Sequence, residues 1–321
     1  MSMLRTVLFL AITFFSCLAV AQEYPSRPVR FISPYPPGGV VDIAARLVGA
    51  KLSELWKQQI VVENRTGGGG ALAADHVAKS PTDGYTYLFA TVSDFCITPH
   101  TYSKLPYDIR RDFTPVLIAT ETPLMLAAHS GAPFSSLQEL IAYSKTLSGG
   151  LSYASPGLGT LNHLTGERLA LDTGANLVHV PYKGGGPAGT AVAAGEVPVG
   201  VLAASSAAPH IKTGRVKAIA VTTQTRINLG PEWPTVIEAG VPDFTASQWV
   251  GVALPVGTPR SIVDKANRDM NLVLKMSEVR ERLNALGSEP AGGTPEEMAA
   301  RMRAESAQFA RIVHRIQLKL D

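Results

Sequence analysis

The stretch YPPGGVVDIAARL, Tyr35 to Leu47, decides the fold class, because two prolines and two glycines stand directly before a helical pattern. The strand-like run VRFIS (29–33) precedes this stretch. Glycines let the backbone turn sharply, and the helix then begins with N–H groups that have no partner within the helix. Such a start is either an ordinary strand-to-helix connection or a site that binds an anion.

The same alternation of strand-like and helical runs continues along the chain, with short connections between them. This pattern indicates an α/β fold with a mostly parallel sheet that helices cover on both faces. Three further helices follow residue 255, and the length favours two lobes rather than one doubly wound sheet. The strand-like runs lie at 29–33, 59–63, 85–90, 123–129, 151–154, 177–182, 197–203, 216–222 and 248–255, and the helical runs at 41–55, 71–80, 135–145, 161–171, 188–195, 261–276, 277–287 and 294–316.

Three more strand-to-helix connections carry glycines: NRTGGGG (64–70), ASPGLGTLNHL (154–164) and PYKGGGPAG (181–189). Doubly wound folds bind ligands in the crevice beyond the carboxyl ends of their strands. If all four glycine turns share that crevice, several helix starts converge there. One helix N-terminus stabilises an anion by ~0.3–1 kcal/mol, and each charge-assisted hydrogen bond adds ~1.5–3 kcal/mol. The turns together therefore suffice to hold a carboxylate without an arginine.

The first 21 residues predict a secretory signal peptide. Arg5 is their only charge, the apolar run TVLFLAITFFSCLAVA follows, and Ala19-Val20-Ala21 is a small-x-small cleavage site. The bulky residues before Cys17 argue against lipid attachment there. We expect cleavage after Ala21, which leaves 300 of the 321 residues and a periplasmic protein that begins at Gln22.

Composition excludes several classes of function. The formal net charge of +3 falls to about +2 without Arg5, which gives no reason to expect nucleic acid as a partner. Cys96 is the only cysteine of the expected mature chain, and we interpret it as a packed thiol rather than a nucleophile. The seven histidines lack the spacing of a zinc site, and no catalytic or nucleotide motif has its full context. We therefore expect neither a metal nor a cofactor.

Five segments of the chain resemble the Bug family, the periplasmic solute-binding receptors of tripartite tricarboxylate transporters. They are YPSRPVRFISPYPPGGVVDIAARL, VVENRTGGGGALAADHVAKSPTDGYTYLFAT, YASPGLGTLNHLTGE, HVPYKGGGPA and WVGVALPVGTP. The resemblance covers nearly the whole mature chain. It implies a two-lobe, Venus-flytrap fold of the type II periplasmic binding-protein kind, and small organic carboxylates as ligands. It also implies that the protein is a receptor and not an enzyme.

The resemblance also implies where the ligand binds. In this family, the Pro-rich glycine loop and the S-x-G-x-G-T turn hold a carboxylate through backbone groups and ordered waters. Three departures stand out: Thr66 where the family often has proline, ITPH (97–100) where Asn-Pro is common, and SDF (93–95), which places an acid in a loop expected to face the cleft. The expected ligand-binding residues are Tyr35, Pro37, Gly38, Gly39, Asn64, Gly68, Gly69, Ser93, Asp94, Ser155, Gly157, Gly159, Thr160, His163, Tyr182 and Lys183.

The strand-like segments near residues 122–126 and 248–252 predict two crossings between the lobes. We expect lobe 1 to comprise 22–124 and 252–321 and lobe 2 to comprise 125–251. The ligand would be captured between them by a monomer, for an inner-membrane tripartite transporter. Two alternatives stay open: a sensory receptor that presents its closed form to another membrane partner, and an enzyme that acts on a small acid.

Overall fold

In the computed structural model of the chain, which describes residues 24–320, ten strands form one continuous sheet. The expected signal peptide lies outside these residues. The strands run in the order β2-β1-β3-β9-β4-β7-β5-β6, and β8 and β10 also pair with β4. The strands are β1 (Val29–Ser33), β2 (Ile60–Asn64), β3 (Thr86–Thr91), β4 (Phe113–His129), β5 (Leu151–Ser155), β6 (Leu177–Pro181), β7 (Val199–Ala203), β8 (Val216–Val221), β9 (Ser247–Pro255) and β10 (Glu289–Gly292).

Helices follow most strands and cover the sheet. In the N-terminal part of the chain, α2 follows β1, and η1 with α3 follows β2, each after a short turn, as the alternating pattern predicts. The helical elements are α2 (Val40–Trp56), η1 (Gly68–Gly70), α3 (Ala71–Ala78), η2 (Ser93–Ile97), α4 (Thr98–Thr101), α5 (Leu137–Thr146), α6 (Leu161–Thr173), α7 (Gly185–Ala194), α8 (Ala204–Lys212), α9 (Arg260–Lys275), α10 (Ser277–Ala285) and α11 (Pro295–Arg315).

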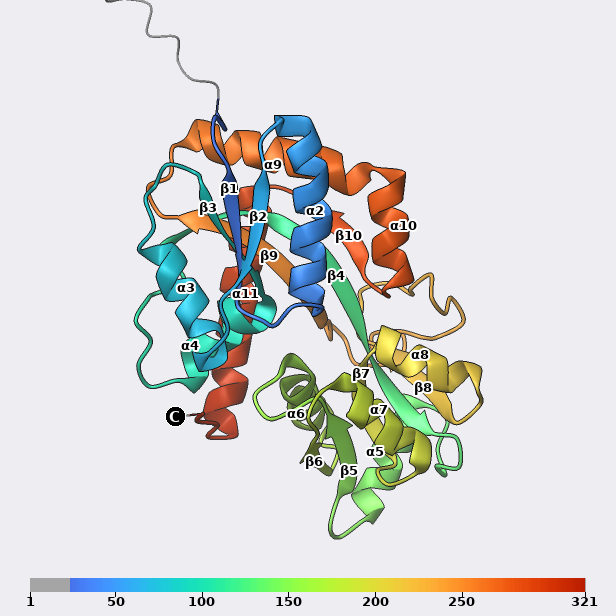
Figure 1. The fold of residues 1–321 in the computed structure, drawn as a ribbon. Coiled ribbons are helices and arrows are strands. Elements are labelled where there is room, and N and C mark those ends of the chain that lie inside the picture. Colours follow the sequence, from blue (N-terminus) through green and yellow to red (C-terminus); the bar gives the residue numbers. More distant parts are fainter. Residues whose placement is uncertain (1–23, 321) are drawn as a thin grey trace, which may run out of the picture.

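The 17-residue strand β4 connects two lobes (Figure 1). Its first part pairs antiparallel with β9 and β10, and its second part, from Leu124, pairs antiparallel with β7 and β8. We call the part built on β1, β2, β3 and β9 the first lobe, and the part built on β5 to β8 the second lobe. The sheet of each lobe contains three parallel strands, β2-β1-β3 and β7-β5-β6. This two-lobe α/β architecture confirms the expected fold class.

The chain returns to the first lobe between β8 and β9, close to the place where β4 leaves it. Thr222 N donates to Leu124 O at 2.9 Å, and Ala246 N donates to Thr222 O at 2.8 Å. After β9, α9 and α10 contact α2, while α11 contacts β4, η2 and α4. All three C-terminal helices therefore pack on the first lobe, although α11 also contacts α6 of the second lobe.

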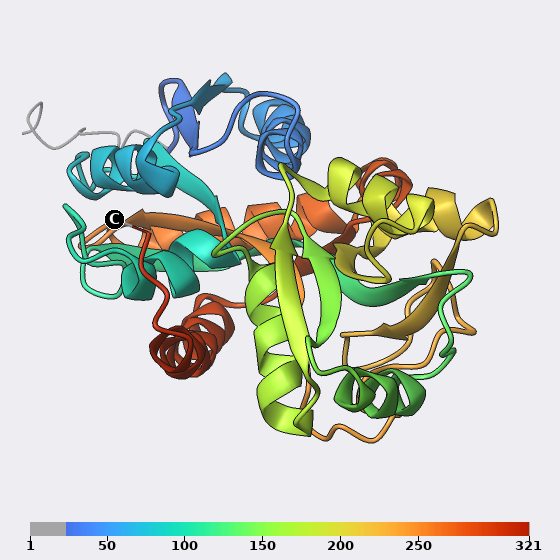
Figure 2. The same ribbon diagram turned by 90° about the horizontal axis from the view of Figure 1, so that it is seen from below.

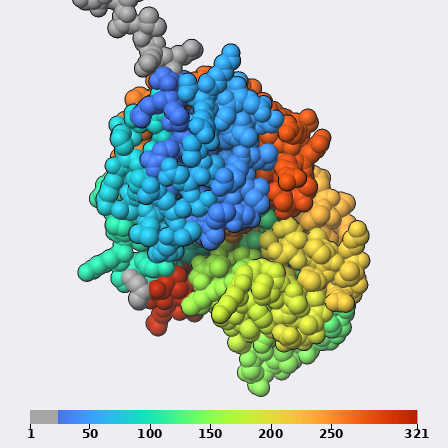
Figure 3. Space-filling model, in the orientation of Figure 1, coloured from blue at the N-terminus to red at the C-terminus, as the bar shows by residue number. Residues whose placement is uncertain are grey.

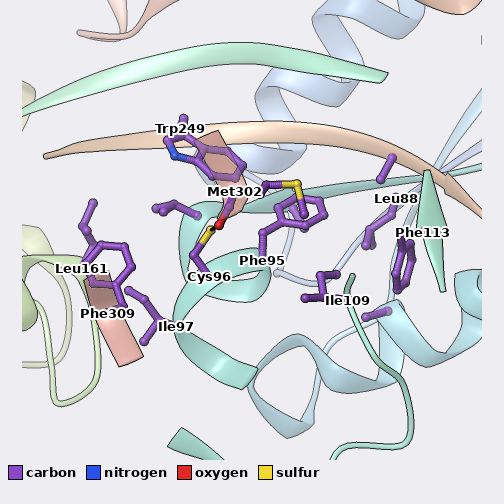
Figure 4. Close-up of a cluster of buried hydrophobic side chains, with 14 of the residues drawn as sticks. Leu88, Phe95, Cys96, Ile97, Ile109, Phe113, Leu161, Trp249, Met302 and Phe309 are labelled. Atoms are coloured by element: carbon purple, nitrogen blue, oxygen red, sulfur yellow. Dashed lines mark hydrogen bonds between the residues drawn. The ribbon is translucent and has the colours of Figure 1, made fainter. Parts of the chain in front are cut away.

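One apolar cluster extends from the first lobe to the start of α6. Figure 4 shows Leu161, at the N-terminus of α6, near Ile97 and Phe309, on the side of the cluster that the second lobe approaches. Cys96 is fully buried in this cluster and lies 3.7 Å from Met302 O. Burial raises the pKa of this thiol far above its usual value, so Cys96 packs as an apolar side chain. The two lobes thus share buried surface next to the connecting strands.

Candidate functional site

The glycine turns after β1 and β5 lie at the facing ends of the two lobes (Figure 1), and the surface is hollowed between the lobes (Figure 3). Each of these turns leads into the N-terminus of a helix, α2 in the first lobe and α6 in the second. The site is therefore built from backbone that the folding of each lobe brings to this boundary.

The first turn presents a helix start that no side chain of the described residues caps. Gly39 is the N-cap of α2 with extended backbone (φ −77°, ψ 167°), and its neighbour Gly38 has φ +85°. Pro37 and Gly38 are exposed. A left-handed φ favours glycine, so Gly38 makes the turn possible while Gly39 leaves the first N–H groups of α2 uncovered.

A buried carboxylate fixes this turn against the second turn. Asp42 accepts from Gly38 N (2.9 Å), from Asn64 Nδ2 (2.9 Å) and from Arg46 Nε (3.0 Å). Asn64 Nδ2 also lies 2.9 Å from Tyr35 O. Burial opposes the ionisation of Asp42, but these donors outweigh it and lower its pKa. Asn64 therefore braces the turn, and Asp42 and Arg46 are positioning residues that the sequence analysis did not include.

The second turn takes its shape from four consecutive left-handed residues. Gly67, Gly68, Gly69 and Gly70 have φ values of +127°, +58°, +58° and +95°. Gly68 and Gly69 are exposed, while a Cβ on Gly69 would stand 2.7 Å from the hydroxyl of Tyr102. The glycine run is explained by its backbone conformation alone, whether or not a ligand contacts it.

Asp94 does not face the space between the lobes, contrary to expectation. Residues 93–97 form a turn of π-helix that begins at the half-buried Ser93, and Asp94 is 2% exposed. Its Oδ2 accepts from Tyr35 OH (2.9 Å), Thr91 N (2.7 Å) and Thr91 Oγ1 (2.7 Å). Its Oδ1 lies against Gly70, where an added Cβ would approach to 2.2 Å. From the interior of the first lobe, Asp94 therefore connects the first turn, through Tyr35, with the second turn, through Gly70.

The electrostatics of Asp94 follow from this burial. Desolvation raises the pKa of its carboxyl group, although the three hydrogen bonds oppose the shift. Oδ1 has no hydrogen-bond partner among the described residues. Burial and the charge of Asp94 also raise the pKa of Tyr35 well above its usual value, so the tyrosine donates as a neutral hydroxyl.

In the second lobe, most of the expected side chains are used inside the turn itself. Ser155 and His163 are buried, and Thr160 is the N-cap of α6, where its Oγ1 accepts from His163 N at 3.3 Å. Gly159 N donates to His163 Nδ1 at 3.2 Å, and Gly157 N donates to Ser155 Oγ at 3.1 Å. These contacts hold the turn in shape, and Gly157 is only half-buried.

A second histidine, absent from the expected site, supports this turn. His179 Nε2 lies 2.6 Å from Ser155 Oγ, and its ring stacks on His163 with 3.9 Å between the centroids. Burial lowers the pKa of His163 to about 3, with a smaller contribution from His179, and burial lowers that of His179 to about 4. Both rings are thus neutral at pH 7. His179 lies in the strand-like run 177–182, and the sequence alone did not indicate that its side chain reaches the neighbouring turn.

The fourth turn is joined to the third by backbone hydrogen bonds. Tyr182 N donates to Ser155 O at 2.9 Å, and Gly184 N donates to Pro156 O at 2.9 Å. Gly184 is the N-cap of α7 with no side-chain capping bond, and the neighbouring Lys183 is exposed. Of these two neighbouring turns, the fourth therefore leads into an uncapped helix start, that of α7, and the third into the capped start of α6.

This arrangement defines a class: a two-lobe binding protein whose glycine turns meet at the boundary between the lobes. A family model described as "Tripartite tricarboxylate transporter family receptor" matches residues 44–318. The chain belongs to this family of solute-binding receptors, the family that the sequence resembles.

Named relatives agree with the family. Protein BugT of Bordetella pertussis (strain Tohama I) is 34% identical over 314 residues, which cover 98% of this chain and 96% of BugT. The adipate-bound structure of an R. palustris protein is 34% identical, with a TM-score of 0.77 over 91% of this chain and 98% of that one. MatC from Rhodopseudomonas palustris, with bound malate, is 32% identical, with a TM-score of 0.74 over 90% of this chain and 100% of MatC. Similar proteins thus bind small dicarboxylates.

Among residues 24–320, no helix has the length and apolar character that crossing a membrane would require.

Proposed function

We propose that this chain captures a small organic carboxylate between its two lobes in the periplasm and delivers it to a tripartite tricarboxylate-type transporter. The observation that carries the proposal is the pair of uncapped helix starts, α2 at Gly39 and α7 at Gly184, one in each lobe. Free N–H groups at a helix N-terminus favour an anion, and a carboxylate that reaches both starts would hold the lobes together. The dicarboxylates bound by similar proteins support this chemistry.

The lobes that would close are 22–124 with 252–321, and 125–251. Both connections lie close together where Thr222 bonds to Leu124 and Ala246, and short paired connections are suited to a hinge. The protein would be secreted through a signal peptide cleaved after Ala21 and would act as a monomer. Its membrane partner would recognise the closed form.

The expected ligand contacts are backbone groups of the turns at Tyr35–Gly39, Asn64–Gly69 and Ser155–Thr160, together with Lys183. The side chains of Asp94, Asn64 and His163 would support these backbone groups by holding the turns in position. We propose no catalytic step, because the only cysteine of the described residues is buried and no cluster of metal-ligating side chains occurs among them.

A thermal-shift screen of organic acids tests the proposal. A ligand at 100 times its Kd should add ~2.7 kcal/mol to the free energy of unfolding, which is a readily measured rise in Tm. Mono- and dicarboxylates of increasing chain length should separate into binders and non-binders. If no carboxylate raises the Tm, the proposal is wrong.

Two further experiments separate the alternatives. Incubation of a binding acid with the protein, followed by mass spectrometry, should return the acid unchanged, whereas turnover would indicate an enzyme. Uptake of the acid by cells that lack this protein should fall if it serves a transporter. Unchanged uptake with a lost transcriptional response to the acid would indicate a sensory receptor instead.

A further inference from the structure

A cavity of about 460 Å³ lies between α6 of the second lobe and α11 of the first lobe. These two helices contact each other, and Figure 2 shows α11, in red, on the face of the molecule away from α2, in blue. The cavity is lined by Arg168 from α6 and by Gln308, Arg311 and Arg315 from α11. We call it the arginine cavity. It is separate from the glycine turns.

The arginine cavity carries an excess of positive charge. Its lining holds three arginines and a single carboxylate, Asp172, which accepts from Arg168 Nε at 3.1 Å. Arg311 and Arg315 are exposed, and their side chains form no ion pair or hydrogen bond with any described residue. Two cations one helical turn apart repel each other weakly, and an anion between them would remove this repulsion.

A neighbouring part of α11 carries an arginine whose charge is neutralised by carboxylates of the protein itself. There Arg301 forms ion pairs with Glu121 and Glu305, and its Nη2 donates to Ser247 Oγ at 2.7 Å. Arg301 is thus neutralised, whereas no ion pair joins Arg303, Arg311 or Arg315 of α11 to a described residue, and of these three only Arg311 and Arg315 line the arginine cavity.

The third arginine is held in a fixed position. The side chain of Arg168 is 13% exposed, and it donates to Asp243 O (2.7 Å) and Thr245 O (2.9 Å). In the amide orientation that satisfies both groups, the oxygen of Gln308 accepts from Arg168 Nε at 2.8 Å. Burial lowers the pKa of Arg168, and the charge of Arg311 contributes to this shift. The guanidinium is thus held at the inner end of the cavity, where it contributes positive charge while protein acceptors occupy most of its N–H groups.

We propose that the arginine cavity is a second binding site, for a small anion that carries two or more oxyanion groups. Planar guanidinium groups bind phosphate and carboxylate oxygens in pairs, which a lone chloride cannot reproduce. Because Arg168 belongs to one lobe and Arg311 to the other, a bound anion bridges the lobes on the face away from the glycine turns. It therefore favours the arrangement in which α6 and α11 are adjacent.

The test uses inorganic pyrophosphate, which carries no carboxylate. Calorimetry of the full-length mature protein should show one binding site, with chloride at equal ionic strength as the reference. Arg311→Gln and Arg315→Gln should each weaken binding about tenfold, as expected for the loss of one charge-assisted hydrogen bond. Arg303→Gln is the matched control, because Arg303 is an exposed arginine of α11 that does not line the cavity. This control should bind as the wild type does.

Three outcomes would overturn the proposal. Pyrophosphate does not bind, or Arg303→Gln weakens binding as much as Arg311→Gln does, or Gly39→Val abolishes pyrophosphate binding. The last result would place the anion at the glycine turns instead. Retained pyrophosphate binding in Gly39→Val, alongside weakened carboxylate binding, would establish two separate sites.

Discussion

Substitution of Gly39 by valine separates a backbone site from a site held by a cation. Gly39 has φ −77°, which valine adopts readily, and an added Cβ would meet only Pro36 O, at 3.6 Å. The new side chain would stand at the N-cap of α2, where the ligand is proposed to approach. Replacing an N-cap glycine by an apolar residue costs ~1 kcal/mol, so the fold should survive.

The effect on binding should be much larger than the effect on stability. Two methyl groups over the N–H groups of α2 displace at least one charge-assisted hydrogen bond of ~1.5–3 kcal/mol. Carboxylate affinity should therefore fall by roughly 10- to 150-fold. Lys183→Met should weaken binding less, because Lys183 is exposed and its removal leaves the helix starts unchanged.

Calorimetry with a carboxylate from the thermal-shift screen measures these changes, and circular dichroism confirms that each variant is folded. Gly149→Val is the matched control, because Gly149 is exposed, has no atom within 4 Å of an added Cβ and lies outside the glycine turns. Its affinity should equal that of the wild type. If Lys183→Met loses all affinity while folded Gly39→Val keeps it, a cation holds the ligand and the reasoning fails.

Further predictions concern stability. Gly70→Ala should lower the free energy of unfolding by ~3 kcal/mol or more in denaturant titration, because residue 70 has φ +95° and the Cβ would meet Asp94 Oδ1 at 2.2 Å. Leu161→Ala should cost ~2–4 kcal/mol, because Leu161 is 1% exposed in the cluster shared by the lobes; a smaller loss would mean that the lobes separate easily. Because the pKa values of His163 and His179 are lowered to about 3 and about 4, the unfolded state binds more protons below pH 6.5, so the free energy of unfolding is highest above pH 6.5 and falls as the pH drops toward those values. The slope should be at most ~1.4 kcal/mol per pH unit for His163 and smaller for the half-exposed His179, and it should be absent from a variant with asparagine at both positions.

The strands and helices were predictable because their apolar residues follow regular periods. The helix expected at 41–55 is α2 (Val40–Trp56), and the three C-terminal helices lie within one residue of expectation at their starts. The main error is β4, of which only residues 123–129 were expected. The missed part, from Phe113 to Thr122, is largely buried, but Pro115, several polar residues and two register shifts against β9 interrupt the pattern expected of a strand.

The interior supports of the site were not predictable, because they depend on contacts between distant turns. Asp42 stands in the first turn of α2, and nothing in the local sequence indicates that it bonds to Gly38 and Asn64. Asp94 was expected to face the cleft, yet a π-helical turn directs it inward to Tyr35. Local patterns report which residues are apolar or glycine, but they do not report which polar side chain meets which turn.

The glycines of the four turns fall into two groups: those that the backbone conformation or the packing requires, and those that neither requires. Positive φ values demand glycine at Gly38, throughout 67–70, and at Gly157, Gly159 and Gly184, while Gly185 stands against Ser206. Neither reason applies to Gly39 or to Gly186, which has no atom within 4 Å of an added Cβ. These two positions lie at the uncapped starts of α2 and α7, one in each lobe. Apart from the mild preference for glycine at an N-cap, neither the backbone nor the packing of the described residues requires glycine at these two places, as expected if the proposed ligand occupies the space that a side chain would fill.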